Sequence, residues 1–285
     1  METYLRIILL VAAFLFGAIL GSFACCQAWR IRMKEQGKKS PGKWSVCLSC
    51  GKRLKKSENI PIFSWFMQKG KCKSCGAKIG VAEILSELTL AVAMPLVLNV
   101  LFDKIASLII DNQIAGIAII ILQALVIIAS MTVMWILLIY DAKWKKLPTF
   151  LLATLNICAV IYVALSVTSQ FINGSTFQEV GVYLLRALGS AALLAGPYFL
   201  LSTFSKEKLV GSGDWLIALP IALILGHFWL ALVTLFVANG LGSIIGLIYK
   251  ARSGQKQIPF GPFLVVAFVL VYSLQSWLLS LIVVL

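Results

Sequence analysis

Two aspartates stand where long apolar stretches meet short basic segments. Asp214 lies in the sequence Gly211-Ser-Gly-Asp, and Asp141 ends the apolar run 114–140. Charged side chains next to hydrocarbon are rare and are functional-site candidates. Two neighbouring carboxylates cannot both ionise cheaply, so one keeps a proton, and the pair titrates with shared, macroscopic pKa values. The ionised partner can take a proton from water while the protonated one polarises a peptide carbonyl.

Each aspartate also has an ordinary structural explanation. Asp214 could cap the N-terminus of a helix, and Asp141 could be a polar residue at the end of a span. Gly211 and Gly213 would let the backbone bend and let another segment approach Asp214 closely. The catalytic interpretation needs both aspartates on the same side of the membrane.

The composition is that of a polytopic membrane protein. The chain has 285 residues, 60% of them hydrophobic, with a mean hydropathy of +0.96. A helix needs about 20 apolar residues to cross the hydrocarbon core. The sequence therefore predicts an all-α membrane protein with about eight transmembrane helices, near residues 5–24, 82–102, 114–140, 147–168, 180–203, 213–226, 228–249 and 258–284. The sixth stretch is short enough to be a half-helix, and residues 5–24 are expected to be a retained span and not a cleaved signal.

The net charge of +14 is concentrated on alternate connections. Residues 26–80 hold fourteen of the 25 Lys and Arg, and most of the others lie in 141–146, 204–212 and 250–257. The positive-inside rule predicts that these four segments are cytoplasmic and that both termini are outside. Both aspartates then lie at the cytoplasmic face. Topology and contact with anionic membrane lipid account for the charge, so we expect no nucleic-acid partner.

Two CxxC pairs in the long basic segment predict a metal site. They are Cys47-Leu-Ser-Cys50 and Cys72-Lys-Ser-Cys75, each followed by a glycine. Paired thiolates at this spacing suit tetrahedral Zn2+, and a cytoplasmic location argues against the disulfide alternative. Four sulfur ligands would close the site, so the metal would be structural. The other cysteines, Cys25, Cys26 and Cys158, are expected to be small buried residues.

Two glutamates open the second apolar stretch. Glu83 and Glu87 are one helical turn apart, on one face near the cytoplasmic boundary. A negative charge at a helix N-terminus explains Glu83, whereas Glu87 lies one turn deeper and is harder to dismiss. The single histidine, His227, is predicted to lie in an external turn and is assigned no role.

Six sequence features, in their order along the chain, resemble those of the bacterial type IV prepilin leader peptidases and N-methyltransferases. They extend over nearly the whole chain: Gly21-Ser-Phe23 followed by Arg30, the paired CxxC motifs around Asn59-Ile-Pro61, Ser64-Trp65 and Gly70-Lys-Cys72, Glu87, Asp141 with Leu147-Pro148, Gly211-Ser-Gly-Asp214, and Pro259-Phe-Gly-Pro262.

The resemblance implies a membrane aspartyl protease of the GxGD type in the bacterial plasma (inner) membrane. Asp141 and Asp214 would be catalytic, with Gly211, Gly213, Glu87 and Pro148 in support. The enzyme would cut basic leaders from type IV prepilin-like precursors at the cytoplasmic face and then methylate the new N-terminus with S-adenosyl-L-methionine. The chain would divide into a first span (1–25), a cytoplasmic zinc-binding segment linked to methyl transfer (26–80), and a peptidase domain (81–285).

Two departures from the family pattern keep alternatives open. Cys25-Cys26 stands where the family has an asparagine, which leaves a peptidase without methyltransferase activity as one alternative. Trp215-Leu216 follows the GxGD motif where valine and lysine are common. A proton- or cation-coupled transporter, or an assembly scaffold, would be of a different class, but transport sites usually lie near the midplane in repeated halves.

Overall fold

The computed structural model describes residues 2–38, 42, 44–110, 114–208, 210–253 and 259–283. These residues are mostly helical, and the strand-like pairing among them is limited to two isolated β-bridges. The elements are α1 (Glu2–Glu35), η1 (Lys56–Glu58), α2 (Phe63–Met67), α3 (Val81–Ile110), α4 (Ile114–Trp144), α5 (Thr149–Ile172), α6 (Phe177–Phe204), α7 (Ser212–Leu225), α8 (Phe228–Ser253), α9 (Gly261–Ser273) and α10 (Gln275–Val283).

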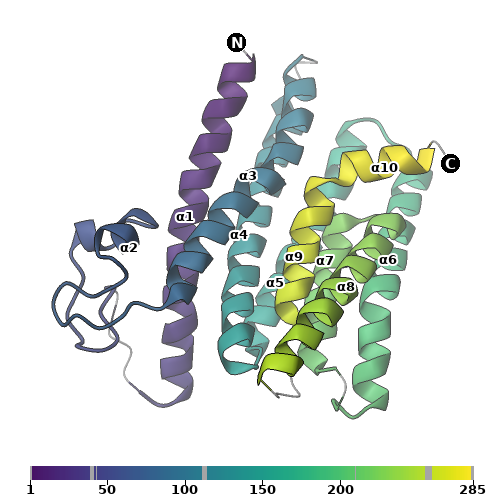
Figure 1. Ribbon diagram of the computed structural model, residues 1–285. Helices are drawn as coiled ribbons and strands as arrows, with labels where there is room; N and C mark the ends of the chain where they lie inside the picture. Colours follow the sequence, from purple (N-terminus) through teal and green to yellow (C-terminus); the bar gives the residue numbers. More distant parts are fainter. Residues whose placement is uncertain are drawn as a thin grey trace. The chain divides into compact units, whose positions relative to one another are not determined.

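The chain divides into two compact units, Met1–Leu96 and Val97–Leu285. The first unit contains α1, the segment with η1 and α2, and the start of α3. The second contains α4 to α10, with the end of α3 (Figure 1). Asp141 and Asp214 belong to the second unit and the CxxC cysteines to the first.

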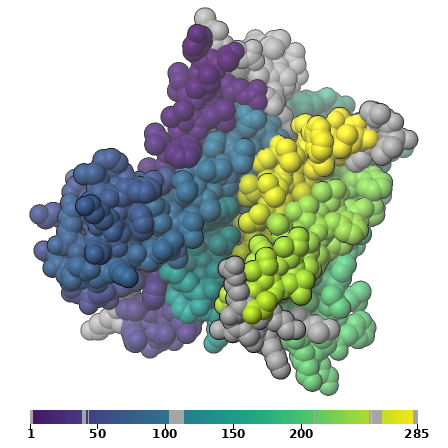
Figure 2. Space-filling view, in the orientation of Figure 1, coloured from purple at the N-terminus to yellow at the C-terminus, as the bar shows by residue number. Residues whose placement is uncertain are grey.

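In the first unit, two glycines let α1 lie against α3. A β-carbon added at Gly17 would lie 2.5 Å from the Leu90 carbonyl oxygen, and one at Gly21 would lie 2.5 Å from that of Ser86. The Ser86 hydroxyl donates a hydrogen bond to the Gly21 carbonyl at 2.8 Å. Glycine is therefore required at position 21 because the two backbones touch there. The segment between the helices forms a compact lobe (Figure 2, blue).

The second unit is built around α7. This helix packs against α5, α6, α8 and α9, and most of its side chains are buried. Its 14 residues extend about 21 Å, less than the hydrocarbon core of about 30 Å. It ends at Gly226, which has a left-handed φ of 60°. The predicted sixth span is therefore a short helix that packs against four others.

The membrane-spanning helices agree with the predicted fold class and refine its count. Six of the described helices are long and apolar enough to cross a membrane, and the pair α9–α10 could form a seventh. That last predicted span, 258–284, is bent by 70° between α9 and α10, and its two ends lie outside the described residues. At the other end of the chain, α1 continues beyond the predicted span, to Glu35.

The turns follow from the sequence. Pro148 precedes α5 and accepts hydrogen bonds from the N–H groups of Leu151 and Leu152 at 3.1 and 3.2 Å. The α6 N-terminus is a capping box: the Glu179 N–H donates to the Thr176 hydroxyl, and the Glu179 carboxylate accepts the Thr176 N–H at 2.7 Å. Part of the basic segment 250–257 lies outside the described residues.

The charge distribution predicts which side of the membrane each connection occupies. In intact cells, an impermeant thiol reagent added from outside should not label the natural chain, because Cys47, Cys50, Cys72 and Cys75 would face the cytoplasm. The Asn173→Cys variant, at the end of α5, should be labelled. Permeabilised cells provide the control. Labelling of the CxxC cysteines from outside would reverse the predicted orientation.

Candidate active site and metal centre

Asp141 lies in the last turn of α4 and is buried, with 6% of its surface exposed. Its Oδ2 accepts a hydrogen bond from the backbone N–H of Gly261 at 3.1 Å. Gly261 is the first residue of α9, in the segment Pro259-Phe-Gly-Pro262. A helix N-terminus presents unpaired N–H groups and a partial positive charge, and both stabilise a carboxylate.

Asp214 lies in the first turn of α7 and is also buried, with 9% of its surface exposed. Its Oδ2 accepts the backbone N–H of Gly211 at 3.1 Å, so this carboxylate occupies the third position of the helix and reaches back to the cap. Gly211 has an extended φ of −73°, which any residue could adopt. The expected need for a flexible glycine is therefore not seen at this position.

Gly213 permits a close approach. A β-carbon there would collide with the Leu147 side chain, whose own Cβ lies 3.1 Å from that position. Leu147 immediately precedes Pro148 in the connection from α4 to α5. The first turn of α7 is thus held against the residues that follow Asp141, which explains why a glycine precedes the aspartate.

The Asp141 carboxylate lies at the start of α9, beside a residue from the first turns of α7. A β-carbon on Gly261 would lie 2.9 Å from Asp141 Oδ2 and 3.4 Å from Cδ1 of Ile217, one turn after Asp214. Asp141 and Asp214 are close enough for their charges to interact. Each carboxylate is held at Oδ2 by one backbone donor. The structure therefore brings together two aspartates that lie far apart in the sequence, on α4 and α7.

A half-buried asparagine supports α7 near Asp214. Pro220 has no N–H, so the Leu216 carbonyl loses its normal helical donor. The Asn156 side chain on α5 replaces it, donating from Nδ2 to the Leu216 oxygen at 3.0 Å. This contact and that of Gly261 were not predicted from the sequence. The only sequence feature that could have indicated a role for Asn156 is that it is a polar residue within an apolar span.

The four predicted metal ligands lie together. Their sulfur atoms are all within 4.8 Å of one another, and Cys47 Sγ lies 3.8 Å from Cys75 Sγ. A tetrahedral site with zinc–sulfur bonds of about 2.3 Å has sulfurs about 3.8 Å apart. None of the seven cysteines, all of which the structure describes, forms a disulfide. The cluster has the ligand type, number and spacing that Zn2+ requires.

Both CxxC pairs form the same turn. The N–H groups of Gly51 and Gly76 donate to the carbonyls of Cys47 and Cys72 at 2.8 Å, and both glycines have left-handed φ values of 71° and 70°. An isolated β-bridge closes each turn: Val46 pairs with Arg53 around the first, and Lys71 pairs with Lys78 around the second. A residue with a β-carbon would be strained at either glycine.

The thiols of the cluster differ in acidity. The backbone N–H of Cys50 lowers the pKa of Cys47 to about 6, below the ordinary value of a thiol. The pKa of Cys75 moves in the opposite direction, to about 11. The Ala77 N–H lowers it, but desolvation and hydrogen bonding to the other three sulfurs raise it further. A divalent cation would complete the deprotonation.

Glu87 ties the cysteine-bearing segment to the helices. Its carboxylate accepts the Ile62 N–H at 2.6 Å and a hydrogen bond from the Ser22 hydroxyl. Ile62 is the centre of a γ-turn, with φ 64° and a Pro61 C=O to Phe63 N–H contact of 2.6 Å. This conformation is strained for a β-branched residue. The hydrogen bond to Glu87 offsets part of that cost, which gives Glu87 a structural role.

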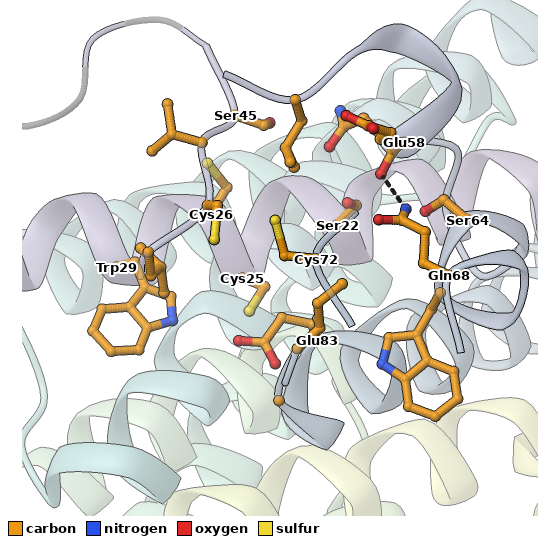
Figure 3. Close-up of a pocket in the computed structure, with 18 of the residues that line it drawn as sticks. Ser22, Cys25, Cys26, Trp29, Ser45, Glu58, Ser64, Gln68, Cys72 and Glu83 are labelled. Atoms are coloured by element: carbon orange, nitrogen blue, oxygen red, sulfur yellow. Dashed lines mark hydrogen bonds between the residues drawn. The ribbon is translucent and has the colours of Figure 1, made fainter. Parts of the chain in front are cut away.

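A cavity of about 240 Å3 lies between α1, α3 and the cysteine-bearing segment within the first unit. Figure 3 shows Ser22, Cys25, Cys72 and Glu83 around it, with Trp29 at one side. Trp65, Glu58 and Glu87 also line it. Cys25 is buried as predicted, but Cys26 is only half-buried and faces the same space. The cavity therefore combines carboxylates, indole rings and thiols.

Comparisons with known proteins show which family this chain resembles. Residues 15–101 match the bacterial peptidase A24 N-terminal domain. The chain is 30% identical over 226 residues to a prepilin leader peptidase/N-methyltransferase of Dichelobacter nodosus, an alignment that covers 78% of this chain and 68% of the relative. No solved structure matches it.

Two other relatives align over most of their length. A type 4 prepilin-like proteins leader peptide-processing enzyme of Escherichia coli O78:H11 is 27% identical, with 88% of this chain and 89% of the relative covered. A prepilin leader peptidase/N-methyltransferase of Vibrio cholerae is 24% identical, with 89% and 92% covered. On these similarities, the chain belongs to the prepilin leader peptidase/N-methyltransferase family.

Proposed function

We propose that this protein is a membrane aspartic endopeptidase that removes basic leaders from type IV prepilin-like precursors and then methylates the new N-terminus. The observation that carries the proposal is that two buried carboxylates, Asp141 and Asp214, lie close enough to interact and are each held by one backbone N–H. The names of the relatives support a peptidase and not a transporter. The site would lie at the cytoplasmic face of the bacterial plasma membrane, with both termini outside.

The two carboxylates would divide the work of peptide hydrolysis. The ionised one takes a proton from a water molecule, whose oxygen then bonds to the scissile carbonyl carbon, while the protonated one polarises the carbonyl oxygen. The C–N bond breaks when the nitrogen receives a proton. The Gly261 and Gly211 N–H groups fix one oxygen of each carboxylate, so the other can face water and substrate.

The cavity of the first unit is our candidate for methyl transfer. S-adenosyl-L-methionine would supply a methyl group from a positively charged sulfur. The indole rings of Trp29 and Trp65 and the carboxylates of Glu58, Glu83 and Glu87 line the cavity and would favour a cation. Cys47 and Cys72 belong to the same wall, so a zinc ion bound there would hold the cavity in shape.

A peptidase without methyltransferase activity is the second candidate. The observation that favours it is the position of Cys25 and Cys26, which line this cavity where the family has an asparagine. The mass of the processed N-terminus separates the candidates, because methylation adds one methyl group. Both candidates use the same pair of aspartates.

Removing either carboxylate should abolish cleavage. Asp141→Asn and Asp214→Asn each leave the other aspartate without its partner, so we expect each to slow precursor cleavage by about 10²–10⁴-fold or more. Because the two act as a unit, the double variant should be no slower than either single one. The rate of leader removal from a purified precursor in lipid vesicles measures this.

Membrane insertion and zinc content provide the control, since both substitutions preserve side-chain size. Robust cleavage by either single variant would contradict the peptidase proposal. It would return the two aspartates to capping and span-terminating roles.

Loss of zinc should lower methylation of the product and leave leader cleavage intact. Purified protein should contain about one zinc per chain, because four thiolates complete one tetrahedral site. Cys47→Ser combined with Cys72→Ser should lose it and lower the methylated fraction of the product. Cleavage should persist because the aspartates lie in the other unit. Cys158→Ser is the matched control, since Cys158 lies on α5. Unchanged metal content in the double variant would end the zinc proposal.

A further inference from the structure

Tyr198 is a buried tyrosine that the proposed reaction leaves without a role. It lies on α6, one residue after Pro197, and 3% of its surface is exposed. Its hydroxyl contacts the Asn239 side chain of α8 at 2.9 Å. A phenol hydroxyl buried in an apolar bundle requires partners for both its oxygen and its proton.

The contact with Asn239 fixes the direction of the hydroxyl. Asn239 Nδ2 also lies 2.8 Å from the Leu235 carbonyl oxygen. A carbonyl can only accept, so the side-chain atom facing it must be the amide nitrogen and not Oδ1. The same nitrogen then donates to the Tyr198 oxygen. The hydroxyl proton of Tyr198 must therefore point away from Asn239.

The surroundings of Tyr198 place it beside the aspartates. It is close enough to Asp214 for the two side chains to interact electrostatically. Its ring packs on Phe260 with centroids 5.3 Å apart. Phe260 immediately precedes Gly261, whose N–H donates to Asp141. A β-carbon added at Gly242 on α8 would lie 3.0 Å from Cε2 of the Phe260 ring, so the glycine leaves room for this ring. Tyr198 thus lies near Asp214 and packs on the residue that precedes the backbone donor to Asp141.

We propose that Tyr198 is a catalytic hydrogen-bond donor of the peptidase site, with its hydroxyl directed at the scissile carbonyl oxygen. This inference rests on the proposed function. As the water oxygen bonds to the carbonyl carbon, the carbonyl electrons move to its oxygen. A neutral donor fixed in a site that excludes water stabilises that charge without reorganising. Tyr198 keeps its proton throughout, and Asn239 is a positioning residue that orients it.

The same unit contains a tyrosine that serves as a matched control. Tyr162 on α5 is also buried, and its hydroxyl lies 3.3 Å from that of Tyr272 on α9. No contact recorded among the described residues links Tyr162 to either aspartate. Tyr162→Phe therefore removes one buried hydroxyl from the bundle, as Tyr198→Phe does, but at a distance from the proposed chemistry.

The test compares these variants in leader cleavage by the purified full-length protein in lipid vesicles. Tyr198→Phe should lower kcat by about 10²–10³-fold, the usual effect of losing one oxyanion donor. KM should change by less than about twofold, since the interaction forms in the transition state. Tyr162→Phe should retain the natural kcat. Thermal unfolding and zinc content should match in both.

A binding measurement keeps the test independent of turnover. A leader peptide with a statine residue at the cleavage site presents a tetrahedral hydroxyl in place of the carbonyl. Tyr198→Phe should weaken its binding by a similar factor but leave binding of an uncleaved substrate, measured in the Asp141→Asn background, unchanged. Asn239→Leu keeps the phenol but releases its direction, so it should give a smaller loss of kcat. It carries the test if Tyr198→Phe does not fold.

The outcomes separate the two proposals. Equal kcat in Tyr198→Phe and Tyr162→Phe, with Asp141→Asn inactive, would overturn the role of Tyr198 and leave the peptidase intact. A selective loss in Tyr198→Phe that also weakens statine binding supports it. If the natural protein cleaves no precursor, both proposals fall.

Discussion

The second unit depends on a close approach of backbone around two buried carboxylates. Burying an ionised group costs several kcal/mol unless it is hydrogen-bonded and paired. Here each aspartate receives a backbone N–H at 3.1 Å, from Gly261 and from Gly211. Gly261 and Gly213 lack the β-carbons that would push these segments apart. The remaining helices enclose this arrangement and keep α7 in place.

The short length of α7 follows from the same constraint. α7 begins against Leu147 in the connection between α4 and α5, and it ends after 14 residues at Gly226. Pro220 weakens its first turns, and Asn156 replaces the missing donor from α5. The second unit thus encloses the first turn of α7, which carries Asp214, and a neighbouring helix supplies the hydrogen-bond donor that α7 lacks at Pro220.

The sequence predicts much of the site because its residue types follow from chemistry. Four thiols in CxxC pairs, glycines after them, and two aspartates at span ends are local patterns, and the structure brings each set together. The contacts of Gly261, Asn156 and Tyr198 could not be predicted because they join residues from 41 to 120 positions apart. The extension of α1 and the 70° bend between α9 and α10 depend on packing that no local pattern specifies.

The central claim is that the close approach at Gly261 positions the aspartates for hydrolysis. The most direct measurement is precursor cleavage by Gly261→Ala beside Gly240→Ala, because an added β-carbon meets Asp141 Oδ2 at 2.9 Å in the first and nothing within 4 Å in the second. A displacement of about 1 Å can cost about 10²-fold in rate. The account predicts a loss approaching that size for Gly261→Ala and the natural rate for Gly240→Ala. Equal rates in the two variants would contradict it.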